Sequence, residues 1–282
     1  MTTAGILLTT LTYILILIAI LTFPLVKKIT NSYLFWFFYS ATMLALVLVF
    51  RFYLDFKDAS NAFKIGISQS DGLILSKSFL LDFCPATCLL ISFLPIVDPT
   101  RKSAQVIAPI AVFGGLITLT FEILMDSNAA FTFEYIFQGV GSNRAYFLIH
   151  FINAMTGTLV LLNTPKTNFK TFIWTNVFAI CYYLYVFIIV KIFDGIIIDH
   201  TSGLLPDDWN GGEYWRVAEL LKVSYPWCMI ISLTLAYFVI VGILFSPKLL
   251  QKNKHWIVPN VKSYTPLWGY YNIEIVKLDS IQ

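Results

Sequence analysis

Seven apolar runs of bilayer-spanning length decide what this chain can fold into. A hydrocarbon core about 30 Å thick needs about 20 apolar residues in a helix to cross it. The sequence has such runs at 5–26, 33–54, 78–97, 105–125, 145–162, 171–193 and 225–245. Only 12% of the 282 residues are charged, whereas a soluble domain carries about 25%. We therefore predict an all-α polytopic membrane protein, a bundle of about seven transmembrane helices.

Basic residues on the connections between the runs predict the orientation of the bundle. Lysine and arginine gather on alternate connections, at 27–28, 101–102, 166–170 and 248–254. Short cytoplasmic connections carry an excess of these residues, which predicts the N-terminus outside and the C-terminus in the cytoplasm. We assign 1–247 to a transmembrane domain, with a core catalytic region at 78–245, and 248–282 to a cytoplasmic C-terminal tail.

The remaining composition narrows the class of protein. The polar segment 55–77 is predicted to be a weakly amphipathic connection, and the aromatic-rich segment 126–144 to be interfacial or re-entrant. A formal charge of +3 indicates no nucleic-acid partner. All four cysteines lie in apolar segments, which disfavours a secreted disulfide framework. We expect a multi-pass protein of a cell (plasma) membrane, and the residue usage suggests a bacterial one.

Ionisable and nucleophilic side chains gather at one depth, near the predicted outer surface. At a rise of 1.5 Å per residue, Cys84 lies roughly 9 Å inside the outer end of the third run, just after Asp82. His150 lies roughly 7–8 Å inside the outer end of the fifth run. The same layer holds Glu122, Tyr225 and Trp227. Ionisable residues within a membrane are rare and mark functional sites, so this layer predicts a site shared between helices.

Cys84 and His150 form a candidate nucleophile and base. A thiol attacks as its thiolate, and an imidazole can accept the thiol proton and return it to a leaving group. A carboxylate from Asp82 or Glu122 would orient the imidazole as in a catalytic triad. The acyl donor would be an ester of a membrane lipid, and no cofactor is expected. A metal site on Cys84, Cys88 and His150 lacks an evident fourth ligand, so we expect no metal.

Four short motifs resemble those of the YwaF-like bacterial integral membrane family. The run LLDFC at 80–84 resembles the family's Leu-Pro-Leu-His-Leu-Cys motif, and YFLIH at 146–150 resembles its aromatic-rich segment ending in histidine. WTNV at 174–177 and SYPW at 224–227 are similar to its Trp-x-Asn-x and Gly-Pro-Trp-Pro elements. Asp82 stands where the family has His or Glu, and Ser224 stands where it has Gly.

The resemblance implies a lipid-modifying enzyme. The family is related to an animal transmembrane ether-lipid acyltransferase, thought to use the matching cysteine and histidine. The androgen-regulated fatty-ester hydrolases, more distant relatives, use a threonine and a histidine in a similar helical fold. By this resemblance Cys84 is the acyl-accepting nucleophile and His150 is the base. The role of Asp82 stays open between support of catalysis and pairing with Lys77 or Arg144.

Each candidate residue could also have a purely structural role, in packing or in hydrogen bonds between helices. Cys84 suits a buried position as a small hydrophobe. His150, Glu122 and Asn176 suit hydrogen bonds between helices, and we expect Asn176 to bond a neighbouring helix. The glycine pair at 114–115 favours close packing of the fourth run.

These observations favour an integral membrane acyltransferase. An acyl chain passes from an outer-leaflet phospholipid through a Cys84 thioester to a lysophospholipid or to the N-terminal amine of a lipoprotein. Asp82, Glu122, Asn176, Tyr225 and Trp227 are assigned supporting roles. A membrane lipid hydrolase would use the same cysteine and histidine, with water as acceptor. A small-molecule transporter, or its substrate-binding membrane subunit, and a scaffold without chemistry are the alternatives from other classes.

Overall fold

The computed structural model describes residues 2–68, 71–139, 144–164, 167–193, 196, 203, 206–210 and 214–250 of the chain. This part of the chain is helical and contains no strand. Seven helical segments in it are long and apolar enough to cross a membrane. The predicted all-α fold with about seven spans is confirmed.

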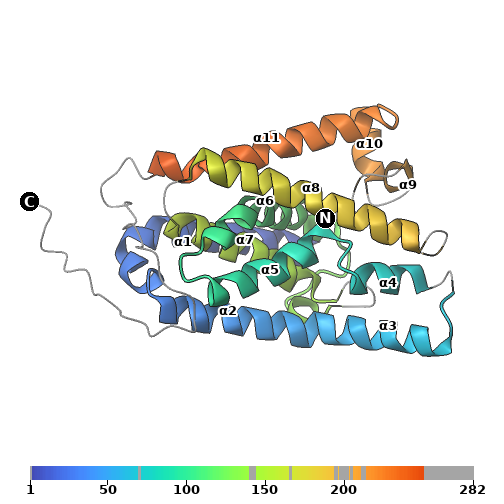
Figure 1. Cartoon of the computed structure of the whole chain (residues 1–282), viewed down its shortest axis with the longest axis horizontal. Coiled ribbons are helices and arrows are strands. Elements are labelled where there is room, and N and C mark those ends of the chain that lie inside the picture. The colour runs from blue at the N-terminus through green and yellow to red at the C-terminus, as the bar shows by residue number, and fades with distance from the viewer. Residues whose placement is uncertain are drawn as a thin grey trace, which may run out of the picture.

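Most of the spans match the predicted runs, and two do not (Figure 1). The spans comprise α1 (Thr3–Thr30); α2 (Tyr33–Val47), η1 (Leu48–Phe52) and α3 (Tyr53–Ile65); α4 (Gly72–Ser78) and α5 (Phe83–Val97); α6 (Lys102–Met125); α7 (Tyr146–Asn163); α8 (Phe169–Ile192); and α11 (Trp227–Leu250). The connections contain η3 (Glu134–Gln138), α9 (Pro206–Trp209) and α10 (Trp215–Leu221). The second and third spans depart from their predicted runs.

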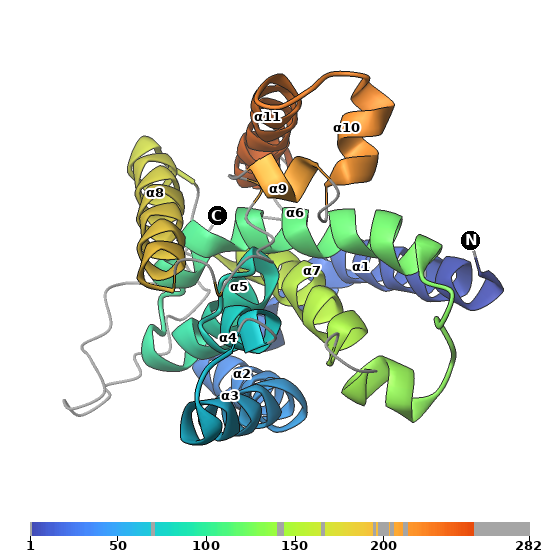
Figure 2. The same cartoon turned by 90° about the vertical axis from the view of Figure 1, so that its right-hand side faces the viewer.

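Helices α6 and α7 form the centre of the bundle and share its most extensive packing. Their backbones approach closely at two glycines. A Cβ on Gly115 would lie 2.6 Å from the carbonyl oxygen of His150, and one on Gly157 would lie 3.0 Å from that of Ala108. The close packing predicted for the glycine pair of α6 is therefore confirmed. In Figure 2, α8, α11 and the α2–α3 rod are seen end-on, whereas α6 and α1 are seen from the side and cross them.

The second span is one continuous rod, longer than its predicted run. After α2 the helix passes through the π-helical turn η1 into α3, so 55–65 extends the helix where the sequence predicted a polar connection. Asp55, Ala59 and Ala62 are buried on one face of this extension. Their spacing of four and three residues is that of a helix face, and this face is what secures the extension.

The third span is interrupted near its start. Helix α4 ends in a Schellman-type turn, in which the Leu81 N–H donates to the Ser76 carbonyl at 3.0 Å. Leu80 takes the left-handed conformation of this turn, with φ of 55°, where glycine is usual. The chain is then extended at Asp82 before α5 begins. The third predicted run is thus the second part of a discontinuous span covering 72–97.

Two tyrosines of α8 satisfy two of the carbonyl groups that this break leaves open. The Tyr182 hydroxyl donates to the Leu80 carbonyl at 2.8 Å, and the Tyr185 hydroxyl donates to the Phe79 carbonyl. A backbone polar group inside a bilayer has no water to bond and must be satisfied by protein. These bonds therefore make an interrupted helix tolerable within the membrane and hold α8 beside it.

Polar contacts group the connections at two opposite ends of the bundle. At one end the guanidinium of Arg101 donates to the Asn31 side chain and to the Asn163 carbonyl, both at 3.1 Å. At the other end the Thr2 hydroxyl donates to the Asp126 carbonyl. Successive connections thus alternate between the ends. Which end faces the cytoplasm stays a prediction.

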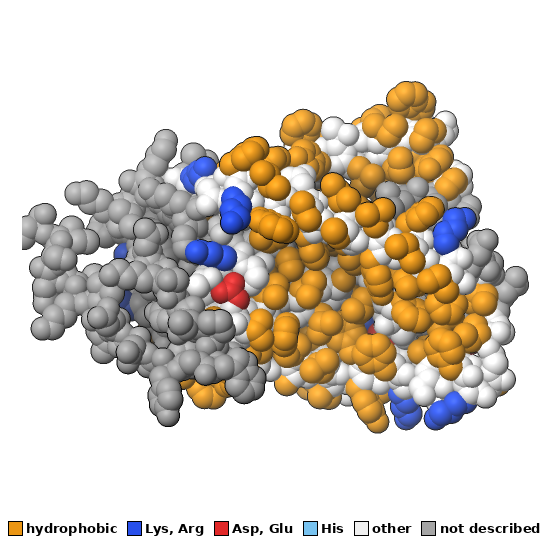
Figure 3. All heavy atoms as spheres, in the orientation of Figure 1, with side chains coloured by type: hydrophobic (Ala, Val, Ile, Leu, Met, Phe, Trp, Pro, Cys, Tyr) orange, Lys and Arg blue, Asp and Glu red, His pale blue; other side chains and the backbone are white. Residues whose placement is uncertain are grey.

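A hydrophobic surface surrounds the bundle. Figure 3 shows hydrophobic side chains over most of one face, with lysine and arginine toward both ends. In the most apolar windows of α8 and α11, only 22% and 11% of the residues are buried, so most of their apolar side chains face outward. Such a surface suits the hydrocarbon of a membrane. Beyond Leu250 the predicted tail at 248–282 lies outside the described residues.

Candidate functional site

Cys84 lies in the first turn of α5, directly after the break. Its backbone N–H and that of Phe83 have no hydrogen-bond partner among the described residues, and the Asp82 side chain does not cap the helix. The first turn of a helix carries the positive end of its dipole. Two N–H donors and a thiol are therefore presented together at this turn.

A glycine on α6 makes room for the thiol. A Cβ on Gly114 would lie 2.9 Å from Sγ of Cys84, and Thr118 faces the thiol from one turn further along α6. From α7, the Asn153 amide donates to the Cys84 carbonyl at 2.8 Å and accepts from the Thr87 hydroxyl at 3.3 Å. Cys84 is thus fixed where α5, α6 and α7 meet.

His150 is buried on α7, one turn before Asn153. Its Nδ1 lies 2.6 Å from the Tyr146 carbonyl oxygen, and its ring packs on the Tyr146 ring with centroids 4.5 Å apart. A carbonyl only accepts hydrogen bonds, so Nδ1 carries the proton of this bond. In the neutral imidazole Nε2 is then an acceptor. The backbone therefore sets the tautomer in which His150 can act as a base.

No hydrogen bond joins Cys84 to His150. They share surroundings instead: Lys77 and Asp82 lie within electrostatic reach of both side chains. Asn153 also connects the helix of His150 to the backbone of Cys84. The predicted nucleophile and base thus share the same charged neighbours, without a hydrogen bond between them.

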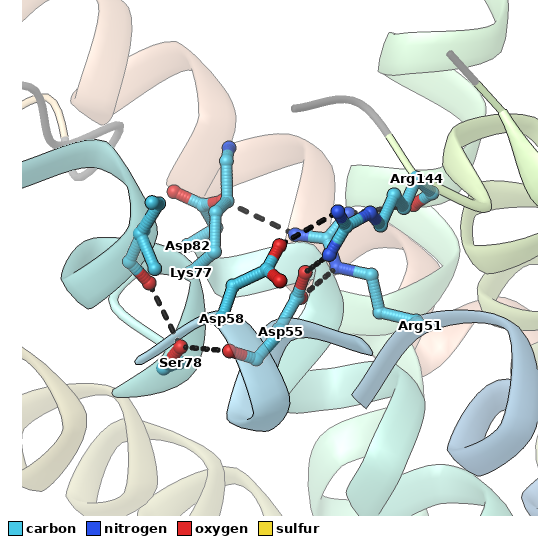
Figure 4. A network of polar contacts seen from close by, with 8 residues as sticks. Arg51, Asp55, Asp58, Lys77, Ser78, Asp82 and Arg144 are labelled. Carbon is cyan, nitrogen blue, oxygen red and sulfur yellow. Dashed lines mark hydrogen bonds and ion pairs between the residues drawn. The ribbon is translucent and has the colours of Figure 1, made fainter. Parts of the chain in front are cut away.

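A network of six charged side chains surrounds the break (Figure 4). Three are basic and three acidic, and they are Arg51, Lys77, Arg144, Asp55, Asp58 and Asp82. The ammonium of Lys77 lies 2.6 Å from the carboxylate of Asp82. Of the two partners that the sequence allowed for Asp82, the structure selects Lys77. The equal numbers of charges make the network neutral as a whole.

Arg51 joins this network from the π-helical turn η1 and is only 2% exposed. Its Nε donates to Asp55 at 2.6 Å, and its Nη1 donates to the Arg144 carbonyl at 2.7 Å. Its Nη2 lies 4.0 Å from the Asp82 carboxylate, beyond hydrogen-bond reach, and has no hydrogen-bond partner among the described residues. One edge of the guanidinium is therefore directed at the start of α5 with its donors unused.

Sequence reasoning did not single out Arg51 or Asp55. The signal was present, because charges that follow an apolar run without a turn signal are expensive unless they are paired. Their separation of four residues also places them on one helix face. In addition, π-helical turns within α-helices are frequent at functional sites, but a sequence does not reveal them.

The other supporting residues lie elsewhere. Glu122 is exposed on α6, and Trp227 is 61% exposed at the start of α11. The Asn176 side chain donates to the Phe172 carbonyl of its own helix at 2.8 Å. The prediction that it bonds a neighbouring helix is therefore wrong. Tyr225 is partly buried, just before α11. Asp82 is the supporting residue that the structure places beside Cys84 and His150.

The site therefore combines a thiol, an imidazole acceptor and backbone donors. Among the described residues, no group of three or more His, Cys, Asp or Glu side chains is arranged to hold a metal ion. A thiol beside N–H donors and an imidazole suits acyl transfer, in which the thiol attacks a carbonyl and the imidazole moves the proton.

Comparison with known proteins gives relatives in bacteria. Residues 10–266 match the Family of unknown function (DUF5378). The chain is 32% identical over 235 residues to the "Uncharacterized protein MG135" of Mycoplasma genitalium, which covers 76% of this chain and 80% of that protein. It is 35% identical over 175 residues to the "Uncharacterized protein MG135 homolog" of Mycoplasma pneumoniae, covering 61% of each chain. No solved structure matches.

Proposed function

We propose that this chain, which belongs to the family of unknown function DUF5378, is an integral membrane acyltransferase of a bacterial plasma membrane. It takes an acyl chain from an outer-leaflet phospholipid onto Cys84 and passes the chain to a membrane acceptor. The acceptor is a lysophospholipid or the N-terminal amine of a lipoprotein.

The observation that carries this proposal is the position of Cys84 at the start of a half-helix. The residue is partly buried, it stands at the positive end of α5, and on α6 its thiol faces Gly114 and Thr118. Cysteines that serve only to fill a core need none of these features. The nearby Cys88 provides the contrast, because it is fully buried in the hydrophobic core.

The first half-reaction forms a thioester. The Cys84 thiol gives its proton to Nε2 of His150, and the sulfur attacks the ester carbonyl carbon of the phospholipid. The ester C–O bond breaks, and the leaving alkoxide takes the proton from the imidazolium and departs as a lysophospholipid. Because the thiol and the imidazole are not hydrogen-bonded here, rotation of the thiol or one bridging water completes the proton path.

The second half-reaction restores the enzyme. The acceptor amine or hydroxyl attacks the thioester carbonyl, and His150 takes the proton that the acceptor loses. The C–S bond then breaks, and the imidazolium returns this proton to the Cys84 sulfur. Acyl transfer is thereby balanced without any further reactant.

Intact mass measurement tests this cycle. We expect the purified protein, incubated with a phospholipid that carries labelled acyl chains, to gain one acyl mass that hydroxylamine removes. Cys84→Ala should abolish the adduct, Cys88→Ala should keep it, and His150→Gln should slow its formation by about 100-fold or more. Labelling that persists in Cys84→Ala would disprove the nucleophile. Release of free fatty acid by the wild type, dependent on Cys84, would instead assign a hydrolase.

The outer-leaflet assignment depends on orientation and has its own test. Asn210 and Lys102 are exposed at opposite ends of the bundle. In a Cys181→Ala background, a membrane-impermeant maleimide should label Asn210→Cys in intact cells and should label Lys102→Cys only after lysis. The reverse pattern would place the break between α4 and α5 on the cytoplasmic side and exclude an outer-leaflet donor.

A further inference from the structure

The break between α4 and α5 has hydrogen-bond donors without partners in the described part of the chain, whereas two of its carbonyl groups are satisfied. These two carbonyls accept from two tyrosines of α8, as described above. By contrast, the N–H groups of Phe83 and Cys84 and the Nη2 of Arg51 have no partner among the described residues. A group that binds these three donors must supply hydrogen-bond acceptors.

Arg51 places one of these donors inside the protein and not at a hydrated surface. Its side chain is 2% exposed, and an arginine is always charged and carries no acceptor. Nε and Nη1 of Arg51 are hydrogen-bonded within the described residues, but Nη2 is not. A buried donor of a charged group is costly without a hydrogen bond, and such donors are normally paired. Asp82, at 4.0 Å, lies beyond hydrogen-bond reach of Nη2 because its carboxylate is drawn to Lys77 at 2.6 Å.

The level of the break along the bundle matches that of lipid headgroups. In the second span the apolar sequence of α2 and η1 gives way to α3, which carries Asp55, Lys57, Asp58 and Lys64 within thirteen residues. The charged network thus lies at the border between the apolar part of the rod and its polar extension. Figure 3 shows acidic and basic atoms visible through the hydrophobic surface in the region of α4 and α5. In a bilayer, this border faces the phosphates of one leaflet.

We infer that the break between α4 and α5 is a binding site for a phosphate group, presented by the headgroup of a glycerophospholipid. Arg51 Nη2 and the N–H groups of Phe83 and Cys84 donate to the phosphate oxygens, and Lys77 adds a second positive charge. Helix N-termini and arginine both bind phosphate well, because they present N–H donors together with positive charge. Asp82 competes with the phosphate for Lys77, so it weakens binding.

The site would place the lipid for acyl transfer. The ester carbonyls of a glycerophospholipid lie a few bonds from its phosphate, and Cys84 belongs to the same helix turn as the phosphate donors. This last step rests on the proposed function, whereas phosphate binding itself does not.

Native mass spectrometry of the purified protein tests the site. The probes are phosphatidylglycerol, diacylglycerol with the same acyl chains, and inorganic phosphate alone. We expect phosphatidylglycerol to be retained and diacylglycerol to be lost. Lys77→Gln should weaken retention of phosphatidylglycerol by about tenfold or more, the value of a hydrogen bond to a charged group. The matched control is Lys102→Gln, an exposed lysine at the opposite end, which should bind as the wild type does.

Asp82→Asn should change the retention of phosphatidylglycerol in the opposite direction to Lys77→Gln. This test therefore does not rely on a variant that loses binding. Removing the competing carboxylate should tighten retention of phosphatidylglycerol. Weaker retention in Asp82→Asn, equal retention of both lipids, or an unchanged Lys77→Gln variant would each overturn the site. Inorganic phosphate that binds with the same dependence on Lys77 would support the phosphate site and assign it to free phosphate instead of a lipid. Cys84→Ala should retain the lipid, so failure of acyl transfer and failure of this site are distinguishable.

Discussion

Replacing Arg51 with methionine tests whether the buried ion pair with Asp55 stabilises the fold at the break. The two side chains are 2% and 6% exposed, and Nε lies 2.6 Å from Oδ2. Methionine keeps much of the length of the side chain but removes the charge. Among the described basic residues, Asp55 then retains Arg144 as its ion-pair partner, whose Nη1 is 3.5 Å away. Removal of one partner of a buried ion pair costs about 3–5 kcal/mol, and because Arg144 remains, we expect about 3 kcal/mol.

The matched double variant separates this ion pair from ordinary packing. Arg51→Met with Asp55→Leu removes one positive and one negative charge together. The other four charged side chains of the network still balance, since they pair among themselves at 2.6 and 2.7 Å. Replacement of a buried ion pair by hydrophobic residues is often neutral or stabilising. The double variant should therefore be close to the wild type, far above the stability expected from adding the two single changes.

Unfolding of the purified protein in mixed micelles by sodium dodecyl sulfate measures these differences, followed by the fluorescence of the seven tryptophans. Single and double variants form a double-mutant cycle. An Arg51→Met variant that loses less than about 1 kcal/mol would show that the ion pair is not stabilised by burial as we reason. Additive losses in the double variant would likewise contradict the coupling.

Three further changes probe the packing and the ends of α6. Gly114→Ala should displace the thiol and slow formation of the Cys84 thioester with little loss of stability, whereas Gly242→Ala, which has no atom within 4 Å of the new Cβ, should leave the rate unchanged. Gly115→Ala meets backbone atoms at 2.6 and 2.7 Å and should destabilise the fold by about 1–3 kcal/mol in the same micelle assay. Partial burial alone would raise the pKa of Asp98, but hydrogen bonds from Ser103 and Thr100 outweigh it and hold this pKa below its usual value. Its stabilising contribution is therefore present above about pH 4 and is lost as the pH falls through the lowered pKa, so unfolding measured against pH should be less acid-sensitive in Asp98→Asn.

Hydrophobicity located the seven spans because a bilayer demands length and apolarity, which a sequence displays directly. The break in the third span left no such signal. Glycine usually marks the left-handed position of a Schellman turn, and here Leu80 occupies it, at a conformational cost of roughly 1–2 kcal/mol. Tyr182 and Tyr185, about a hundred residues later, satisfy the carbonyls of this turn. A contact so distant in sequence cannot be inferred from local pattern.

Depth along a helix was enough to predict that Cys84 and His150 share surroundings, but not to choose the residues around them. The rise per residue fixes the level of a side chain, whereas its direction depends on how the helices are rotated and packed. Glu122 lies at the expected level and points outward on α6. Arg51 escaped notice because its importance comes from α3 continuing the rod beyond the apolar run, which brings Asp55 within its reach.

Interrupted membrane spans also occur in transporters. The position of the break along the third span distinguishes a transporter from a lipid-modifying enzyme. Transporter sites formed by discontinuous helices lie near the middle of the membrane, where they can be reached from both sides in turn. Here α4 has seven residues and is roughly 10 Å long, so the break lies close to one end of the bundle. The charged network lies at that same end, and α5 continues for fifteen residues toward the other. A site this near one surface can exchange with one leaflet only, which suits a lipid substrate held at its headgroup better than a solute carried across.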